Sequence, residues 1–375
     1  MKEDLKKRHD TTEYILKEYQ TKSLPSEFVA SLLGCDVFDF WRDIANSEQK
    51  FKSCTGEHGE QYEAICAVRD SMQKGCVIDA LTLHIIYILG FVEVVKSVFG
   101  EIYLTESSLD LFKMKEDKLK ANGINSYMFV SWRNGQIIRD EISVELIKAK
   151  TDACQKEFDW VKTNTISVIA ESVETLPDEI AKLRDAISLS FFDPVLAAKD
   201  TNKLLLCEDG PYRKLAIKNV KIRGAWLQPV LAVATEEKII SPVDYIEAVS
   251  ELIQIGHGFT SINSQMLQKS IDVRFELFEI LAASLFVENA EIHSHASVMK
   301  NFLTTIWSSQ IQPSLQGQAA TSILLSRIFF GEWKRCHKSI CLEDIVMMLY
   351  PLRLNRNFEV YLRHWMRGHF LISSK

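Results

Sequence analysis

Residues 76–110 read CVIDALTLHIIYILGFVEVVKSVFGEIYLTESSLD, and this stretch decides the fold. It opens with a short apolar run that ends at Asp79, followed by two apolar segments of helical length, 80–89 and 91–99, separated by Gly90. A second apolar run, 101–104, leads into a segment that begins with Thr105, a residue that favours helix starts. The order strand, two helices, strand, helix predicts a parallel sheet flanked by helices.

The same alternation returns near residue 186. The spacing predicts a helix over 192–198, a strand over 203–207 and a helix after the Asp209-Gly210-Pro211 turn. A short edge strand over 221–226 and a helix over 227–235 follow. The two stretches together predict an α/β fold.

Three regions follow from the pattern along the chain. We expect a helical N-terminal region at 1–75, an α/β domain at 76–235 and a helical C-terminal region at 236–375. The α/β domain carries an insertion at about 112–185. Within it we expect a charged linker at 113–120, a hairpin turning at Asn134-Gly135, and helices starting near residues 143 and 177.

Composition limits the class of protein. The chain has 375 residues, 47% of them hydrophobic, and a net charge of −6, so any nucleic-acid surface must be local. The eight cysteines are scattered and several lie in apolar runs, which is typical of reduced thiols. The longest apolar stretch, 81–98, contains His84, Glu93 and Lys96, and the chain opens on a charged helix. We therefore expect a cytoplasmic protein with no membrane partner.

Four aspartates mark the ends of strands or the starts of helices in the two α/β stretches. They are Asp79, Asp110, Asp193 and Asp209. The carboxyl ends of parallel strands converge on one crevice, so these carboxylates are expected to meet there. Clustered carboxylates repel one another and need a cation, for which Mg²⁺ and Mn²⁺ are the usual choice. The pattern favours a metal-dependent phosphodiesterase site.

The two stretches also resemble the two halves of a PIN domain, a family of metal-dependent nucleases, most of which act on RNA. The resemblance covers about 76–110 and 186–235. It implies a four- or five-stranded parallel sheet with helices on both faces and hydrolysis of phosphodiester bonds with Mg²⁺ or Mn²⁺. Weaker similarity around Gly224 and His257 points to PIN modules fused to large, repeat-bearing bacterial proteins.

The resemblance also implies roles for individual residues. Asp79, Asp110, Asp193 and Asp209 would be the catalytic residues and the metal ligands, with Glu208 in the outer shell of the metal. Arg213, one helical turn after Asp209, would hold a substrate phosphate, and Thr82 would accompany the first acid on the substrate side. Asp110 stands where the family more often has Glu, and the interval from Asp110 to Asp193 is longer than the family's core needs.

Other interpretations of the same residues stay open. An aspartate at a helix start is often an N-cap, so the fold could be an inert PIN-like scaffold that serves as an interaction subunit. Residues 24–45, a helix, a glycine turn and a helix, could instead belong to a DNA-binding regulator, although the turn lacks a basic face.

The expected partners follow from the nuclease interpretation. The substrate is nucleic acid, RNA rather than DNA. The helical regions would bind a protein partner or a second copy of the chain. A bacterial toxin or an anti-phage defence system is the expected setting, by analogy with bacterial PIN nucleases.

Overall fold

The computed structural model describes most of the chain. The described residues are 2–47, 49–54, 56–57, 59–122, 126–133, 135–171, 188–285, 292–308, 313–330 and 355–370. They fall into two compact units, Met1–Ile240 (unit 1) and Ser241–Lys375 (unit 2). Each unit is described by itself below. The helix expected near residue 177 lies outside the described residues.

A five-stranded parallel sheet forms the centre of unit 1, with the strand order β6-β3-β2-β7-β8. The strands are β2 (Cys76–Ile78), β3 (Ile102–Thr105), β6 (Ile166–Val168), β7 (Leu204–Leu206) and β8 (Gly224–Ala225). Ile78 pairs with Leu104 on one side and with Leu206 on the other, so the carboxyl ends of β2, β3 and β7 lie at one edge. The α/β fold class predicted from the sequence is confirmed.

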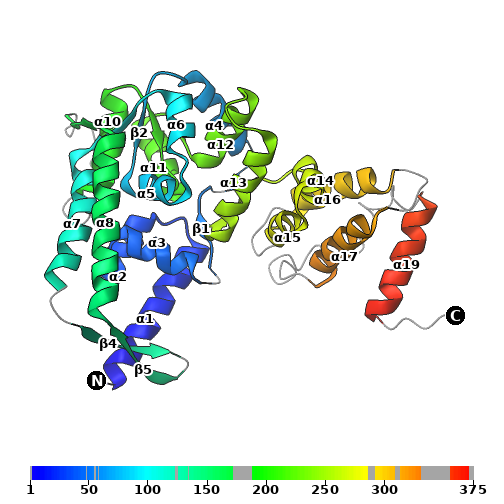
Figure 1. Ribbon diagram of the computed structural model, residues 1–375, viewed down its shortest axis with the longest axis horizontal. Helices are drawn as coiled ribbons and strands as arrows, with labels where there is room; N and C mark the ends of the chain where they lie inside the picture. The colour runs from blue at the N-terminus through cyan, green and yellow to red at the C-terminus, as the bar shows by residue number, and fades with distance from the viewer. Residues whose placement is uncertain are drawn as a thin grey trace. The chain divides into compact units, whose positions relative to one another are not determined.

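Helices cover both faces of this sheet, as Figure 1 shows. Val77 and Leu205 belong to the core beneath helices α10 and α11. Side chains alternate along a strand, so Cys76 and Ile78 face the opposite layer, and both are fully buried. The helices that follow or flank the strands are α4 (Glu60–Asp70), α5 (Ala80–Leu89), α6 (Val92–Phe99), α10 (Leu189–Asp200), α11 (Gly210–Val220) and α12 (Leu227–Glu236).

The N-terminal region is helical, as expected. It contains α1 (Lys2–Thr21), α2 (Ser26–Leu33), α3 (Val37–Ala45) and the short strand β1 (Phe51–Lys52). Pro25 precedes the first turn of α2, and Gly34 ends that helix at φ 71°, a conformation that glycine adopts without strain. The inner faces of α1 and α3 meet where the ring of Tyr19 contacts that of Phe40 edge-on at 5.2 Å. Helix α2 packs against both of these helices.

The insertion differs in part from the sequence prediction. The hairpin is confirmed, because β4 (Tyr127–Arg133) pairs antiparallel with β5 (Gln136–Ile142). The linker predicted at 113–120 is wrong: α7 runs unbroken through Glu106–Asn122 and lies beside α8 (Val144–Asn164) in Figure 1. Buried Phe112 anchors α7, and a chain rich in Lys, Glu and Leu is a good helix former even when it is charged. The sequence analysis also missed β6, a three-residue edge strand.

Unit 2 is mainly helical and has its own hydrophobic core. Phe278, Phe302 and Trp307 are fully or almost fully buried there. Its elements are α13 (Pro242–Gln254), β9 (His257–Gly258), α14 (Ser264–Val273), α15 (Phe275–Ala283), α16 (Ile292–Ile306), α17 (Leu315–Phe330) and α19 (Arg356–Phe370). The backbone is extended at Arg274 (φ −165°, ψ 123°), and this residue separates α14 from α15.

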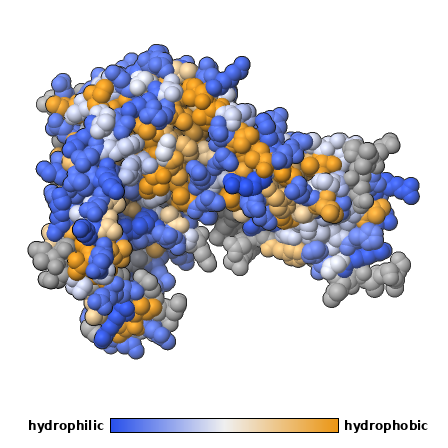
Figure 2. Space-filling view, in the orientation of Figure 1, coloured by the Kyte–Doolittle hydropathy of each residue, from blue (hydrophilic) through white to orange (hydrophobic). Residues whose placement is uncertain are grey.

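Three further observations concern helix hydrophobicity, the surface and the cysteines. No single helix among the described residues has the length and hydrophobicity to cross a membrane. The face seen in Figure 2 mixes hydrophilic and hydrophobic residues over both units. In the part of the chain that the structure describes, Cys35, Cys54, Cys66, Cys76, Cys154 and Cys207 are free thiols.

Candidate active site

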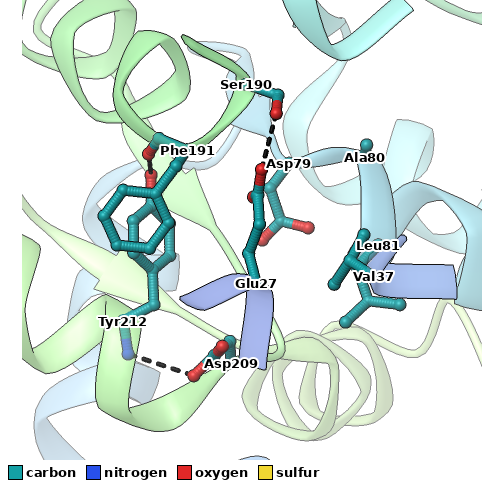
Figure 3. Close-up of a pocket in the computed structure, with 9 residues that line it drawn as sticks. All are labelled: Glu27, Val37, Asp79, Ala80, Leu81, Ser190, Phe191, Asp209 and Tyr212. Atoms are coloured by element: carbon teal, nitrogen blue, oxygen red, sulfur yellow. Dashed lines mark hydrogen bonds between the residues drawn. The ribbon is translucent and has the colours of Figure 1, made fainter. Parts of the chain in front are cut away.

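Two of the four predicted aspartates meet in one cavity at the carboxyl edge of the sheet. Asp79 follows β2 directly, and Asp209 lies three residues beyond the end of the neighbouring strand β7. Both line a cavity of about 20 Å³, together with Glu27 from α2 (Figure 3). A volume of that size holds about one water molecule, and therefore also a small cation.

Asp79 is held by the first turn of the helix that it precedes. Its carboxylate accepts hydrogen bonds from the backbone N–H of Thr82 (2.7 Å) and from the Thr82 hydroxyl (3.0 Å). The same hydroxyl oxygen accepts from the backbone N–H of Glu208 at 2.7 Å. Thr82 is fully buried and ties the carboxylate after β2 to the chain after β7. It thus positions Asp79.

Asp209 is held by donors from two separate parts of the chain. It is the N-cap of α11, accepting from the Tyr212 N–H at 3.0 Å. Its other oxygen accepts from the Ser26 N–H at 2.5 Å, in the first turn of α2. Asp209 is 7% exposed, so these backbone donors replace most of its contact with water.

Glu27 projects from α2 into the same cavity, and Figure 3 shows its carboxylate beside that of Asp79. One of its oxygens accepts a hydrogen bond from the Ser190 hydroxyl at 2.6 Å. Burial, together with the charges of Asp79 and Asp209, raises the pKa of Glu27 to about 7. Burial and the charge of Asp79 also raise the pKa of Asp209 to about 6, and burial raises the pKa of Asp79. Burial is thus the main reason why all three carboxyl groups hold their protons more strongly than in water.

The donor set fits a hard divalent cation by its chemistry. It consists of carboxylate oxygens, the ligands that Mg²⁺ and Mn²⁺ prefer. Among the described residues, no three His, Cys, Asp or Glu side chains converge closely enough, as placed, to hold a metal ion. In this arrangement the Glu27 carboxylate accepts from the Ser190 hydroxyl and the Asp79 carboxylate accepts from the Thr82 hydroxyl.

The other two predicted aspartates do not line this cavity. Asp110 is exposed, in the second turn of α7. Asp193 is half-buried and does not open its helix: α10 begins at Leu189 with Ser188 as the N-cap. Ser190 and Phe191, at the start of α10, face the cavity instead. The sequence pattern placed the start of α10 three residues too late.

The remaining predicted site residues have structural partners. Arg213 is 2% exposed and donates to the carbonyls of Cys207 (2.7 Å) and Ser53 (2.9 Å). It also pairs with Glu60 at 3.1 Å and lies 4.3 Å from the ring centroid of Trp226. Its guanidinium is thus engaged inside the protein.

Glu208, the predicted outer-shell acid, is fully buried. Its carboxylate accepts from the backbone N–H of Leu227 at 2.5 Å, at the first residue of α12. Glu208 thereby connects the end of β7 to the start of the next helix, where a negative charge is favourable.

A comparison with known protein families covers the middle of the chain. Residues 77–217 match the model of a PIN domain associated with the TPR-GreAB-C-PIN system. This segment is a PIN domain. The resemblance seen in the sequence is confirmed over these residues, which carry Asp79 and Asp209. Searches of curated proteins and of solved structures found no match.

The sequence analysis missed Glu27. Pro25-Ser26-Glu27 is an ordinary helix start, with Pro before and Glu within the first turn, and Glu is common there because it complements the helix dipole. No local signal distinguishes such a residue from one that reaches a distant site. Its position at the cavity depends on how α2 packs against the PIN domain.

Proposed function

We propose that the chain is a metal-dependent nuclease that hydrolyses phosphodiester bonds, in RNA rather than DNA. The observation that carries the proposal is the meeting of Asp79 and Asp209 in one cavity within a PIN domain. PIN domains are generally nucleases that use divalent metals. The preference for RNA rests on the family's usual substrate.

In this proposal Asp79 and Asp209 hold Mg²⁺ or Mn²⁺. The bound cation supplies positive charge that polarises the phosphate and lowers the pKa of water. The chain's own groups prepare the carboxylates: Thr82 fixes the orientation of Asp79, and the Tyr212 N–H fixes that of Asp209. Because these carboxylates are largely buried, they are poorly hydrated, and their attraction for a cation is strengthened.

The test uses the full chain with fluorescent single-stranded RNA and DNA of the same sequence, with and without Mn²⁺. We expect Mn²⁺-dependent cleavage of RNA, lost on Asp79→Asn or Asp209→Asn. Asp110→Asn and Asp193→Asn are the matched controls, since they make the same chemical change outside the cavity. Cleavage that survives both cavity substitutions would contradict the proposal, and loss on either control would restore that aspartate to the site.

One observation favours a second candidate, an inert PIN-like scaffold. Asp79 and Asp209 each accept hydrogen bonds at a helix N-terminus, as purely structural caps do. A scaffold would bind no Mn²⁺, and Asp79→Asn would lower stability without any effect that depends on the metal. Calorimetric titration of the full chain with Mn²⁺ separates the two candidates before any substrate is chosen.

The partners are proposed from the family description. The matched family is associated with a TPR-GreAB-C-PIN system. We propose that this chain acts with a protein of that system, docked on its helical regions, as a toxin or in defence against phage. Size-exclusion chromatography with light scattering, on the chain alone and with a TPR-bearing protein of such a system, distinguishes a hetero-complex from self-association.

A further inference from the structure

The cavity lined by Asp79 and Asp209 is too small for the substrate that the proposed function requires. Its volume of about 20 Å³ holds about one water molecule. A phosphodiester group consists of a phosphorus and four oxygens, so it does not fit into the same space. Asp209 is 7% exposed and Asp79 is half-buried. In this conformation RNA therefore cannot place a phosphate against a cation held by these two carboxylates.

Part of the wall of this cavity comes from outside the PIN domain. Glu27 on α2 and Val37 on α3 line it, and both precede the segment that matches the family. In Figure 3 the Glu27 side chain extends towards Ser190, whose hydroxyl donates to its carboxylate at 2.6 Å. The Ser26 N–H donates to the carboxylate of Asp209 at 2.5 Å. Helix α2 thus contacts one of the two proposed metal ligands directly.

Residues 51–54 pack against the turn that carries Asp209. Arg213 donates to the Ser53 carbonyl at 2.9 Å. A Cβ added at Gly210, next to Asp209, would lie 2.9 Å from the Cα of Cys54 and 3.0 Å from the carbonyl oxygen of Lys52. The main chain of 51–54 therefore lies directly on this turn. We call α2 together with residues 51–54 the N-terminal cover.

Resting on the proposed function, we propose that the N-terminal cover is an autoinhibitory element of the nuclease. When the cover is closed, it keeps RNA away from the carboxylates, and the Ser26 N–H competes with a cation for an oxygen of Asp209. When the cover is displaced, that oxygen and the space beside it become accessible. The rate of cleavage then depends on the fraction of molecules in which the cover is open.

The alternative is that the cover is a permanent wall and RNA reaches the carboxylates without moving it. Ser26→Pro separates the two, because it removes the N–H that donates to Asp209 at the first residue of a helix, where proline is tolerated. Pro25, at φ −61° and ψ 141°, already has the extended backbone that a following proline requires. Val144→Pro is the matched control: Val144 is the exposed first residue of α8, follows the extended Ser143, and does not line the cavity.

The experiment measures cleavage of fluorescent single-stranded RNA by the full chain with Mn²⁺. We expect Ser26→Pro to cleave at least about tenfold faster, because a hydrogen bond to a charged group contributes about that factor to an equilibrium constant. Ser190→Ala, which removes the hydrogen bond to Glu27 without changing the cover itself, should cleave about fivefold faster. Ser26→Ala, which loses the hydroxyl but keeps the N–H, and Val144→Pro should stay within about twofold of the unsubstituted chain.

Hydrogen exchange followed by mass spectrometry, without RNA or metal, measures the opening of the cover independently of activity. Peptides that cover residues 27–33 should exchange faster in Ser26→Pro and Ser190→Ala, and at the unchanged rate in Ser26→Ala and Val144→Pro. Circular dichroism checks that each variant is folded.

The inference is overturned when neither Ser26→Pro nor Ser190→Ala cleaves RNA faster than the unsubstituted chain. If the unsubstituted chain then still cleaves RNA and loses that cleavage on Asp79→Asn, the proposed nuclease stands and only the autoinhibitory role of the cover falls. If none of these proteins cleaves RNA although residues 27–33 exchange faster in the two variants, the proposed function itself fails.

Discussion

At the scale of single residues, the site depends on side chains that join separate strands and helices. Thr82 is the clearest example, because one hydroxyl donates to Asp79 and accepts from the Glu208 N–H. A residue predicted to meet substrate therefore holds a carboxylate in place. Arg213 likewise has structural partners, since it donates to two carbonyls inside the protein, and its contact with a phosphate stays a prediction.

Arg213 provides a residue-scale prediction. We expect Arg213→Met to destabilise the fold by about 3 kcal/mol, because Glu60 loses its buried partner and two carbonyls lose a donor. Urea unfolding measures the loss. Arg69→Met is the control: Arg69 forms an exposed pair with Glu236, and exposed pairs contribute little to stability. Unchanged stability with weakened RNA binding would instead support the phosphate-binding role that the sequence suggested.

At the scale of elements, a buried ionic cluster joins the PIN core to the insertion. His84 on α5 contacts Glu157 on α8, and Lys115 on α7 pairs with the same carboxylate at 3.2 Å. The rings of Phe38 and Trp41 on α3 contact His84 edge-on. This cluster connects four helices, one of which, α5, is the helix that Asp79 caps.

The cluster predicts how stability depends on pH. Burial lowers the pKa of His84 below its ordinary value of roughly 6.5. Burial by itself raises the pKa of the Glu157 carboxyl. The hydrogen bond from His84 and the charges of His84 and Lys115 have a larger effect together, so the pKa lies below its ordinary value. Both groups then bind protons more readily in the unfolded chain. The stability linked to His84 falls as the pH falls below about 6.5, and the stability linked to Glu157 falls only as the pH falls below about 4.3.

Between pH 7.5 and pH 5.5 the proton that unfolded His84 takes up lowers the stability, whereas the raised pKa values of Glu27 and Asp209 act in the opposite direction. We therefore expect the fall in pH to favour the folded state of His84→Gln, which cannot take up that proton, more than that of the unsubstituted chain. Urea denaturation followed by circular dichroism at the two pH values measures the difference in midpoint. An equal change in both proteins would show that His84 does not titrate on unfolding.

Elements differ in how far the sequence predicts them, for physical reasons. Strands β2 and β7 are buried on both faces and read as continuous apolar runs, and the Asn134-Gly135 hairpin has its own turn chemistry, so local sequence sufficed. Helix α10 was misplaced because Ser188, not Asp193, caps it. Strand β6 is short and lies at the edge of the sheet, where hydrophobicity is a weak signal.

The sequence predicted which aspartates line the cavity only where local sequence controls their position. Asp79 and Asp209 follow directly from their strands, so parallel pairing was enough to bring them together. The directions of the Asp110 and Asp193 side chains depend on how their helices are rotated about the helix axis. An error of one or two residues in the predicted helix start changes that rotation by about 100° or more, because a helix has about 3.6 residues per turn. Glu27 depends on tertiary packing alone, and no local pattern records it.

At the scale of the whole molecule, the chain is two units with separate hydrophobic cores. Unit 1 has the sheet and the three carboxylates, and unit 2 has the core around Phe278, Phe302 and Trp307. Units with their own cores can unfold independently. A ligand that binds one folded unit stabilises that unit by mass action.

We therefore expect two unfolding transitions in scanning calorimetry. Mn²⁺ should raise the midpoint temperature of only the transition that belongs to unit 1. At a free concentration of 100 times Kd, the stabilisation is about 2.7 kcal/mol. Leu324→Ala, at a fully buried position in unit 2, should lower the free energy of unfolding of that unit by about 2–5 kcal/mol. It should therefore lower the midpoint temperature of only the other transition, which assigns the two transitions to the two units. Asp209→Asn should abolish the Mn²⁺ effect. If Mn²⁺ shifts the transition that Leu324→Ala marks, the cation binds outside the cavity, and the carboxylates at the sheet edge are not its site.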